Sequence, residues 1–441
     1  MARKNAHMDF RYDSGPAKVP WGAVGEYYRP GDVAEFVRFL LPARRGCEAG
    51  HRQLMARLAA DLERLGEVST PAAKLSLGGK VREAEAKAAK FFGVKYACFQ
   101  NNWTAGMEVA YKLAGLKPGD EVIVPPLTFI ASVAYPLSIG AKVVFADVDP
   151  RTVNLDPKDV ARKVSARTRA IMPVHIGGHP VDMDPLMEIA GRNGICVIED
   201  AAHGMGAKYK GRYLGTIGHF GGFSLHEVKN INALGEGGLL VSNHELGAQF
   251  SRGRFLGLDF SRRIPNWLYD VAPLYDRYGK PHVPGNSSAT EIQAVGFLVH
   301  LARLKRILAA RKKNAQYLRK RFAGEKAIRL PPADTAETFG SHHLFLLAID
   351  PEEAGGDVQI LRRKLKEKGV TEIPHFGPLY KFQMLRELGY DGMKLALSCP
   401  VAEEMFNRRF THLPVYGLSP EQLEYMADAV LESIGEMRAG R

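Results

Sequence analysis

The sequence predicts an α/β fold in which a mostly parallel sheet of seven strands is covered on both faces by helices. From about Val81 onward, short apolar runs alternate with longer helix-like stretches. Most runs are four to seven residues long and rich in Val, Ile and Phe, which is typical of strands buried on both faces. The seven runs span residues 96–99, 121–124, 142–148, 170–174, 195–198, 222–225 and 239–242.

The segments between these runs are long enough to be crossover helices. Residues 104–116 and 182–193 are the clearest examples, and turn-prone sequences such as Lys117-Pro118-Gly119-Asp120 separate helix from strand. This βαβ order predicts an open sheet between two helical layers. Ligands bind beyond the carboxyl ends of the strands in such sheets, so the residues directly after each run become the candidates for a site.

The rest of the chain divides around this core. The stretch 252–284 is polar and aromatic without periodicity, and residues 289–322 predict one long helix whose first half carries an apolar stripe of Ile292, Val295 and Val299. Its second half has nine Lys or Arg between 303 and 321 and no acid. We interpret these cations as a solvated helix face or as a positive field that steers a phosphorylated substrate. The expected units are an N-terminal helical extension (1–74), a large domain (75–310) and a small α+β domain (311–441) with elements at 344–349, 359–368 and 420–437.

Composition bounds the class of protein. The 441 residues are 46% hydrophobic and 24% charged, as in ordinary globular proteins, which excludes a disordered or disulfide-stapled chain. The four cysteines form no CxxC pair, so no metal site is expected. No apolar signal core opens the chain, and the charge-free stretch 122–141 contains three prolines, so we expect a cytoplasmic protein with no membrane partner. The net charge of +12 alone would allow nucleic acid.

Two residues carry the strongest chemical signal. Asp200 ends the run that begins at Ile195, and Lys229 follows the run 222–225 and precedes Gly235-Glu236-Gly237-Gly238. A lysine in apolar, glycine-rich surroundings can lose its proton and act as a nucleophile. Pyridoxal phosphate chemistry needs a lysine for a Schiff base and an acid that pairs with the pyridine nitrogen. Asp200 and Lys229 are candidates for these two roles.

The sequence around this pair resembles a known family. The block IEDAAHGMGAKYKGRYLGTIGHFGGFSLHEVKNINALGEGGLLVS is similar to the core of the DegT/DnrJ/EryC1/StrS aminotransferases, and three further blocks agree in order: residues 119–157, 285–304 and 412–422. The resemblance covers about residues 75–440. It implies a fold-type I pyridoxal phosphate enzyme, soluble and homodimeric, with active sites shared between subunits and no nucleic-acid partner.

The resemblance implies a role for each matching residue. Lys229 is the expected Schiff-base lysine and proton carrier, Asp200 holds the pyridine nitrogen protonated, and Phe129 stacks on the cofactor ring. His203 is expected at the ring hydroxyl, or else is a plain helix-entry histidine. The remaining cofactor-binding candidates are Trp103 and Thr104 at the phosphate turn, Ser224 ahead of the lysine, and Asn286 from the neighbouring subunit. Trp103 replaces the glycine of the family's Ser-Gly-Thr turn, and Ser288 replaces its usual arginine.

The function that follows is a transaminase. Glu or Gln is expected to donate an amino group, pyridoxamine phosphate to carry it, and a keto sugar (nucleotide-linked) or a keto cyclitol to receive it. The alternatives are a sugar dehydratase of the same family that uses pyridoxamine phosphate, and a regulatory or binding protein that keeps the fold without catalysis. Candidates for holding an anionic substrate are Arg254, Arg262, Arg263 and His375.

Overall fold

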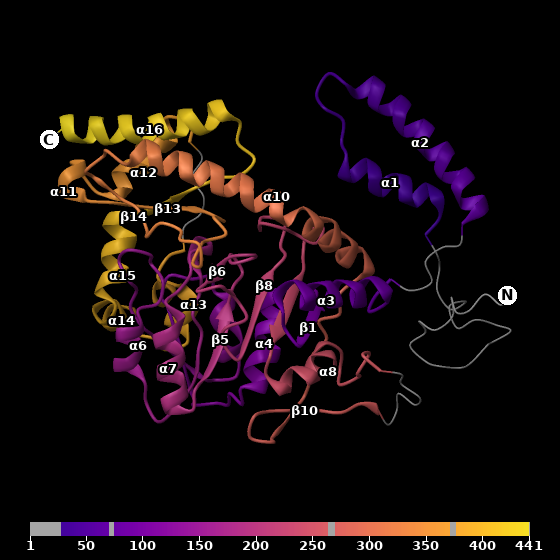
Figure 1. Cartoon of the computed structure of the whole chain (residues 1–441), viewed down its shortest axis with the longest axis horizontal. Helices are drawn as coiled ribbons and strands as arrows, with labels where there is room; N and C mark the ends of the chain where they lie inside the picture. The colour runs from indigo at the N-terminus through magenta and orange to yellow at the C-terminus, as the bar shows by residue number, and fades with distance from the viewer. Residues whose placement is uncertain (1–27, 70–74, 263–269, 371–375, 441) are drawn as a thin grey trace.

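A central sheet of seven strands organises the molecule (Figure 1). The computed structural model describes residues 28–69, 75–262, 270–370 and 376–440. All seven predicted runs are confirmed as strands of one sheet, ordered β1-β9-β8-β5-β4-β2-β3. Their bounds are β1 Tyr96–Gln100, β2 Glu121–Val124, β3 Lys142–Phe145, β4 Thr168–Ile171, β5 Cys196–Asp200, β8 Phe220–Ser224 and β9 Gly238–Ser242.

The sheet is mostly parallel, as predicted. Strands β3, β2, β4, β5 and β8 pair in parallel, whereas β9 runs antiparallel to both β8 and β1. The reversal of β9 brings its first residue, Gly238, opposite Ser224, the last residue of β8. The start of β9 therefore lies at the same edge of the sheet as the carboxyl ends of the parallel strands.

Helices cover both faces because side chains alternate along each strand. In β2, Val122 and Val124 contribute to the core under α4 and α5, while Ile123 contributes to the core on the opposite face with residues of α3, α7 and α10. The predicted sandwich of a sheet between helices is thus confirmed. The covering helices are α3 Gly79–Phe92, α4 Trp103–Leu113, α5 Ala131–Ser138, α6 Pro157–Lys163, α7 Met183–Asn193, α8 Phe250–Arg254 and α10 Glu291–Phe322.

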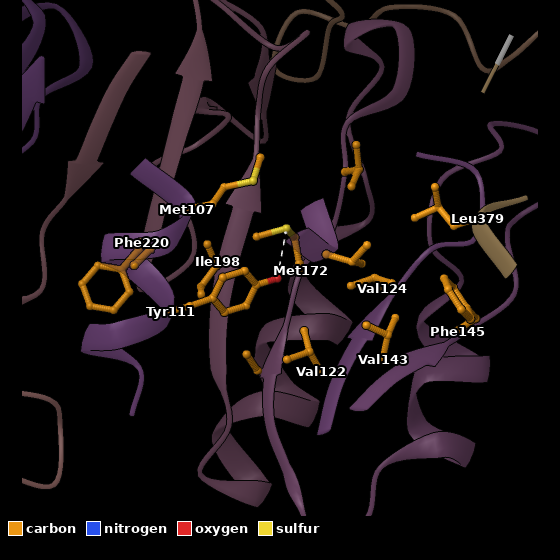
Figure 2. Packing of buried hydrophobic residues seen from close by; sticks show 14 of the residues in the cluster. Met107, Tyr111, Val122, Val124, Val143, Phe145, Met172, Ile198, Phe220 and Leu379 are labelled. Atoms are coloured by element: carbon orange, nitrogen blue, oxygen red, sulfur yellow. Dashed lines mark hydrogen bonds between the residues drawn. The ribbon is translucent and has the colours of Figure 1, made fainter. Parts of the chain in front are cut away.

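The core between α4 and the sheet contains one buried tyrosine that supports the candidate site (Figure 2). Tyr111 is fully buried, and its hydroxyl lies 3.4 Å from the sulfur of Met172 and 2.9 Å from the carbonyl oxygen of Ser132. A buried hydroxyl needs such partners, since an unpaired polar group costs about 1–3 kcal/mol. The contact fixes the backbone at Ser132, whose side chain faces Asp200.

A smaller antiparallel sheet follows in the chain. Strand β13 (Phe345–Ile349) lies between β12 (Ile328–Arg329) and β14 (Phe410–Leu413) and packs under α12 (Val358–Glu367), α16 (Pro420–Ala439) and the last turns of α10. The elements expected at 344–349, 359–368 and 420–437 are confirmed, whereas the expected division after residue 310 falls inside α10 and stays a prediction. The shorter elements are β6 Lys208–Tyr209, β7 Arg212–Tyr213, β10 Leu274–Tyr275, β11 Pro281–His282, α11 Pro351–Ala354, α13 Gln383–Glu387, α14 Gly392–Ser398 and α15 Pro400–Glu404.

The described N-terminal residues, 28–69, form two helices, α1 (Pro30–Leu40) and α2 (Glu48–Val68), packed as a hairpin that lies apart from the main body in Figure 1. None of the helices in the described ranges is long and apolar enough to cross a membrane. The apolar stripe expected to mark the start of α10 is on its exposed side, where Ile292, Val295 and Val299 are 56%, 39% and 43% exposed. The buried side is formed by Ala294 and Phe297 instead.

Candidate active site

Asp200 is the last residue of β5, and the alternation of the strand decides where it points. Glu199 faces the opposite side of the sheet, is fully buried, and accepts hydrogen bonds from the backbone N–H groups of Gly215, Ile217 and Gly218. Asp200 faces the α4 side and is only 4% exposed. The two adjacent acids therefore have different roles. Glu199 holds the loop at residues 215–218 in place, whereas Asp200 faces the candidate site.

The carboxylate of Asp200 is held by three donors. Its Oδ1 accepts from the indole Nε1 of Trp103 at 3.0 Å and from the backbone N–H of Ala202 at 3.1 Å. Its Oδ2 accepts from the hydroxyl of Ser132 at 2.9 Å, and that hydroxyl lies 3.0 Å from Thr128 Oγ1. Three donors that approach from different sides fix the carboxyl group of Asp200 in one orientation.

Trp103 is the first residue of α4, at the position where the family has glycine. Its φ lies outside the left-handed region, so the turn tolerates a side chain, and the N–H groups of the first helical turn stay aimed out of the helix. Asn102 caps the helix by accepting from the N–H of Ala105 at 2.9 Å. The indole is buried against Gly106 and Gly222, where an added Cβ would lie 2.6 and 2.2 Å from the ring. Trp103 therefore holds Asp200 through the indole hydrogen bond and leaves the N–H groups at the N-terminus of α4 open.

Lys229 lies in the loop after β8 and contacts His203. Its Nζ is 3.0 Å from His203 Nε2, and burial lowers the pKa of the Lys229 amine, with Asp200 acting in the opposite direction. The Nδ1 of His203 accepts from the backbone N–H of Gly177 at 3.2 Å. A neutral imidazole that accepts at Nδ1 carries its proton on Nε2, the nitrogen that faces the Lys229 amine.

The surroundings of His203 favour this neutral tautomer. Burial lowers the pKa of His203 well below its ordinary value, and nearby Lys229 acts in the same direction. The ring of His343 stacks on that of His203 at 4.2 Å between centroids, and burial lowers the pKa of His343 as well. His343 is fixed in turn by Asn230, whose Oδ1 lies 2.9 Å from its Nδ1. The pair leaves Lys229 next to neutral groups, which is what an amine nucleophile requires.

These residues line one cavity of about 1110 Å³ at the carboxyl ends of β5 and β8. Seven of the eight predicted site residues lie in its wall: Trp103, Thr104, Phe129, Asp200, His203, Ser224 and Lys229. Phe129 is 62% exposed, and Ser224 Oγ accepts from the N–H of His226 at 3.3 Å. Asn286 is exposed, bonds to Ser288, and is not part of this wall. The roles predicted for the eight residues remain predictions.

The cavity wall also contains residues that were not among the predicted site residues. Three arginines and a histidine come from α10, His412 comes from β14, and His343 and Tyr416 come from the segments next to β13 and β14. The wall residues of this kind are His300, Arg303, Arg306, Arg311, His343, His412 and Tyr416.

The arginines expected to hold an anion are placed elsewhere. Arg254 is buried, pairs with Glu85 and donates to the carbonyl of Phe99, so it fastens β1 to α3. Arg262 pairs with Asp270 at 2.9 Å, away from the cavity wall. Arg263 and His375 lie outside the described residues. The expectation is therefore wrong for the buried Arg254, whose charge has a structural partner, and it stays a prediction for Arg262.

The wall suits a phosphorylated pyridine cofactor. The N-terminus of α4 offers backbone N–H groups to an anion, and the hydroxyl side chains of Thr104 and Ser224 line the same cavity. The carboxylate of Asp200 and the amine of Lys229 supply the two functional groups that pyridoxal phosphate chemistry needs. Gly238 allows the strand β9 to pass close by, because a Cβ there would lie 2.2 Å from the backbone of Asn102.

Comparisons with known proteins agree with this geometry. The family model described as the DegT/DnrJ/EryC1/StrS aminotransferase family matches residues 59–431. A GDP-perosamine synthase of Caulobacter vibrioides is 35% identical over 329 residues, covering 74% of this chain and 84% of its own. The solved aminotransferase of Psychrobacter cryohalolentis superposes with a TM-score of 0.72 at 28% identity, covering 82% and 92% of the two chains. Spr1654 of Streptococcus pneumoniae, in its PLP form, gives a TM-score of 0.72 at 25% identity and 83% and 94% coverage.

The fold and the cavity define a pyridoxal phosphate-dependent aminotransferase of fold-type I. The chain belongs to the DegT/DnrJ/EryC1/StrS aminotransferase family. The expected cofactor, pyridoxal phosphate, and the expected class of enzyme are thereby confirmed, and a sugar aminotransferase is the supported kind.

Proposed function

We propose that this protein transfers an amino group from Glu or Gln to an acceptor, with Lys229 as the catalytic amine. The acceptor is either a nucleotide-linked keto sugar or a keto cyclitol. The observation that carries the proposal is the Lys229–His203 contact at 3.0 Å in a cavity that also holds Asp200. The relationship to a GDP-perosamine synthase supports a sugar substrate, since that relative's name denotes an amino sugar linked to a nucleotide.

The chain's own residues divide the work. The cofactor, when bound, supplies an electron-accepting ring that stabilises negative charge on the substrate carbon. Asp200, which Trp103 and Ser132 fix, would hold the ring nitrogen and keep it protonated. The first turn of α4, with the hydroxyls of Thr104 and Ser224, would hold the phosphate.

Proton transfer falls to Lys229. Its pKa is lowered by burial, so the amine can take a proton from a substrate carbon and return it on the same face. His203 donates through Nε2 in the state described, and this contact orients the amine until cofactor and substrate enter. With the cofactor bound, His203 would be the residue that donates to the ring hydroxyl, as the family resemblance implies.

A homodimer completes the proposed site. Asn286 is exposed and outside the cavity of its own chain, which suits a residue that serves a neighbouring subunit. Large apolar side chains beside the cavity and on α10 are also exposed, including Phe129, Val228 and Ile292 at 62%, 62% and 56%. Exposed large apolar side chains of this kind are typical of an interface.

The test begins with the cofactor. Purified protein should absorb visible light, and borohydride reduction followed by peptide mass spectrometry should place the cofactor on Lys229. Lys229→Ala should lose both this attachment and the release of keto acid from Glu or Gln. A Lys229→Ala variant that still releases keto acid would contradict the proposal, and a wild type that removes a sugar hydroxyl without an amino donor would identify a dehydratase.

A further inference from the structure

A second, smaller cavity of about 140 Å³ lies where the last turns of α10 meet the segment that leads into β13. It is separate from the active-site cavity, although Leu344 lines both. A cavity needs roughly 10–15 Å³ of such space to hold one water molecule, whereas pockets for drug-sized ligands and cofactors take about 300–1,000 Å³. The volume of this second cavity therefore suits a small polyatomic ion.

Two polar side chains in its wall have few partners among the described residues. Arg319 of α10 is half-buried, its Nη1 donates to the carbonyl of Pro331 at 2.9 Å, and it forms no ion pair with any described acid. The ring of His179 makes no hydrogen bond to any described residue. Burial lowers the pKa of His179 to about 4, so the neutral ring has one N–H to donate.

The acid in the same wall is already engaged by two donors. The Oδ2 of Asp334 lies 2.8 Å from Nε2 of His342, and its Oδ1 accepts from the backbone N–H of Gly340 at 3.1 Å. Within the described ranges, no three His, Cys, Asp or Glu side chains are arranged to hold a metal ion. The wall therefore offers the guanidinium of Arg319 to an anion and does not offer a ligand set to a metal.

The backbone between the two cavities also positions His203. Gly177 lines the small cavity, and its N–H donates to His203 Nδ1 at 3.2 Å. Gly340 and His342 line it as well, and they flank Ser341, whose hydroxyl donates to the carbonyl of His203. His342 has a φ of +48°, a left-handed conformation that is strained for a residue with a side chain and persists only where its surroundings fix it. A ligand in the small cavity thus contacts the two segments that orient His203.

We propose that this second cavity is an effector site that binds a small monovalent carboxylate between Arg319 and His179. The planar guanidinium binds two carboxylate oxygens, and the N–H of the neutral imidazole donates to a further lone pair. The negative charge of Asp334 in the same wall favours an anion of single charge over phosphate or sulfate. Occupancy acts on the active site through the backbone at 177 and 340–342. The proposal goes beyond the proposed function and does not depend on the identity of the amino acceptor.

The experiment follows difluoroacetate by fluorine NMR as it binds to the cofactor-loaded protein, with neutral difluoroacetamide as the matched probe. We expect difluoroacetate to bind and difluoroacetamide not to bind. Arg319→Gln should weaken the binding of difluoroacetate about tenfold or more, since a hydrogen bond between charged groups is lost. His179→Phe, which removes the ring N–H, should weaken it as well. Circular dichroism and melting temperatures check that both variants are folded.

A second pair of variants leaves both donors in place. Ala333 is exposed and lines the cavity, so Ala333→Glu adds a negative charge there and should weaken the binding of difluoroacetate. Ala336→Glu is the matched control, because Ala336 is exposed on the same loop and does not line the cavity. The visible absorbance of the bound cofactor reports the effect on the active site. Difluoroacetate should change the spectrum of the wild type, and at the same concentration it should change that of Arg319→Gln far less.

Each outcome decides a separate point. Equal affinity of wild type and Arg319→Gln for difluoroacetate would overturn the site, as would equal effects of Ala333→Glu and Ala336→Glu. Equal binding of difluoroacetamide would overturn the assignment to a carboxylate. A loss of affinity only in the combined Arg303→Gln and Arg306→Gln variant would place the probe in the active-site cavity and overturn the second site. Binding that depends on Arg319 but leaves the cofactor spectrum unchanged would overturn the effector role.

Discussion

The hydrogen bond from Trp103 to Asp200 gives a prediction that can be worked out in energy. Both residues are buried, at 3% and 4% exposure, and the donor–acceptor distance is 3.0 Å. A hydrogen bond to a charged group contributes about 1.5–3 kcal/mol to stability. Trp103→Phe removes this donor and shortens a ring that fills the space between Gly106 and Gly222, so a void adds to the cost.

A double-mutant cycle separates the hydrogen bond from the void. The free energy of unfolding of the cofactor-free protein is measured in urea for wild type, Trp103→Phe, Asp200→Ala and the double variant. The void left by Trp103→Phe costs the same whether residue 200 is Asp or Ala, so its cost cancels from the coupling energy. The hydrogen bond is lost on Trp103→Phe only when Asp200 is present, so its contribution remains. We expect a coupling energy of about 1.5–3 kcal/mol, the full value of a charge-assisted bond.

The result that refutes this reasoning is additivity. A coupling energy below about 0.5 kcal/mol, the usual scatter for independent sites, would mean that the indole fills space and does not hold the carboxylate. In that case Trp103→Phe should also leave cofactor affinity unchanged. If the bond holds Asp200 in place, both Trp103→Phe and Asp200→Ala should weaken cofactor binding.

Three further predictions address the backbone, the amine and the assembly. Gly238→Ala should impair folding and cofactor binding, because its Cβ would lie 2.2 Å from the backbone carbon of Asn102. Gly191→Ala is the control, since a Cβ there would have no atom within 4 Å. Equal melting temperatures for the two variants would contradict the prediction. The lowered pKa of Lys229 means that the unfolded chain binds more protons than the folded chain between the folded pKa and 10.5, so the free energy of unfolding rises with pH in that window. Lys229→Met should flatten this rise, measured by urea unfolding at several pH values. The same pH dependence in wild type and variant would argue against a lowered pKa of the amine. Mixing inactive Asn286→Ala and Lys229→Ala subunits should restore about a quarter of the sites if subunits share them, whereas no recovery after verified exchange would exclude sharing.

Much of the fold followed from hydrophobic pattern because buried parallel strands are short apolar runs with turns between them. The seven strands were predicted to within a few residues, but the antiparallel direction of β9 was not. Direction depends on how the chain returns to the sheet, and the stretch after Ser224 is a compact loop with no crossover helix. The two-residue strands β10 and β11 also escaped prediction, since so short a segment has no periodicity.

The candidate site divides in the same way. Asp200 and Lys229 were predicted because strand ends point to a common edge, whereas the donor from Trp103 depends on a side-chain direction that spacing does not encode. Arg311 was grouped with eight other cations on a face interpreted as solvated or as steering a phosphorylated substrate. The available signal was its position eight residues after Arg303, which places both on one side of a helix. Only the packing of α10 separates the buried Arg311 from the exposed cations of the same stretch.

The contact between Trp103 and Gly106 has an evolutionary consequence. Within α4, glycine at 106 is worse than alanine by about 1 kcal/mol in intrinsic helix propensity, so selection on the helix alone would replace it. The indole forbids that replacement, since its ring lies 2.6 Å from where the methyl group would be. The same mutation, Gly106→Ala, should be harmful while Trp103 is present and beneficial after Trp103→Ala. Residue 103 therefore decides whether a mutation one helical turn away is harmful or beneficial, and glycine at 106 has to precede the tryptophan at 103.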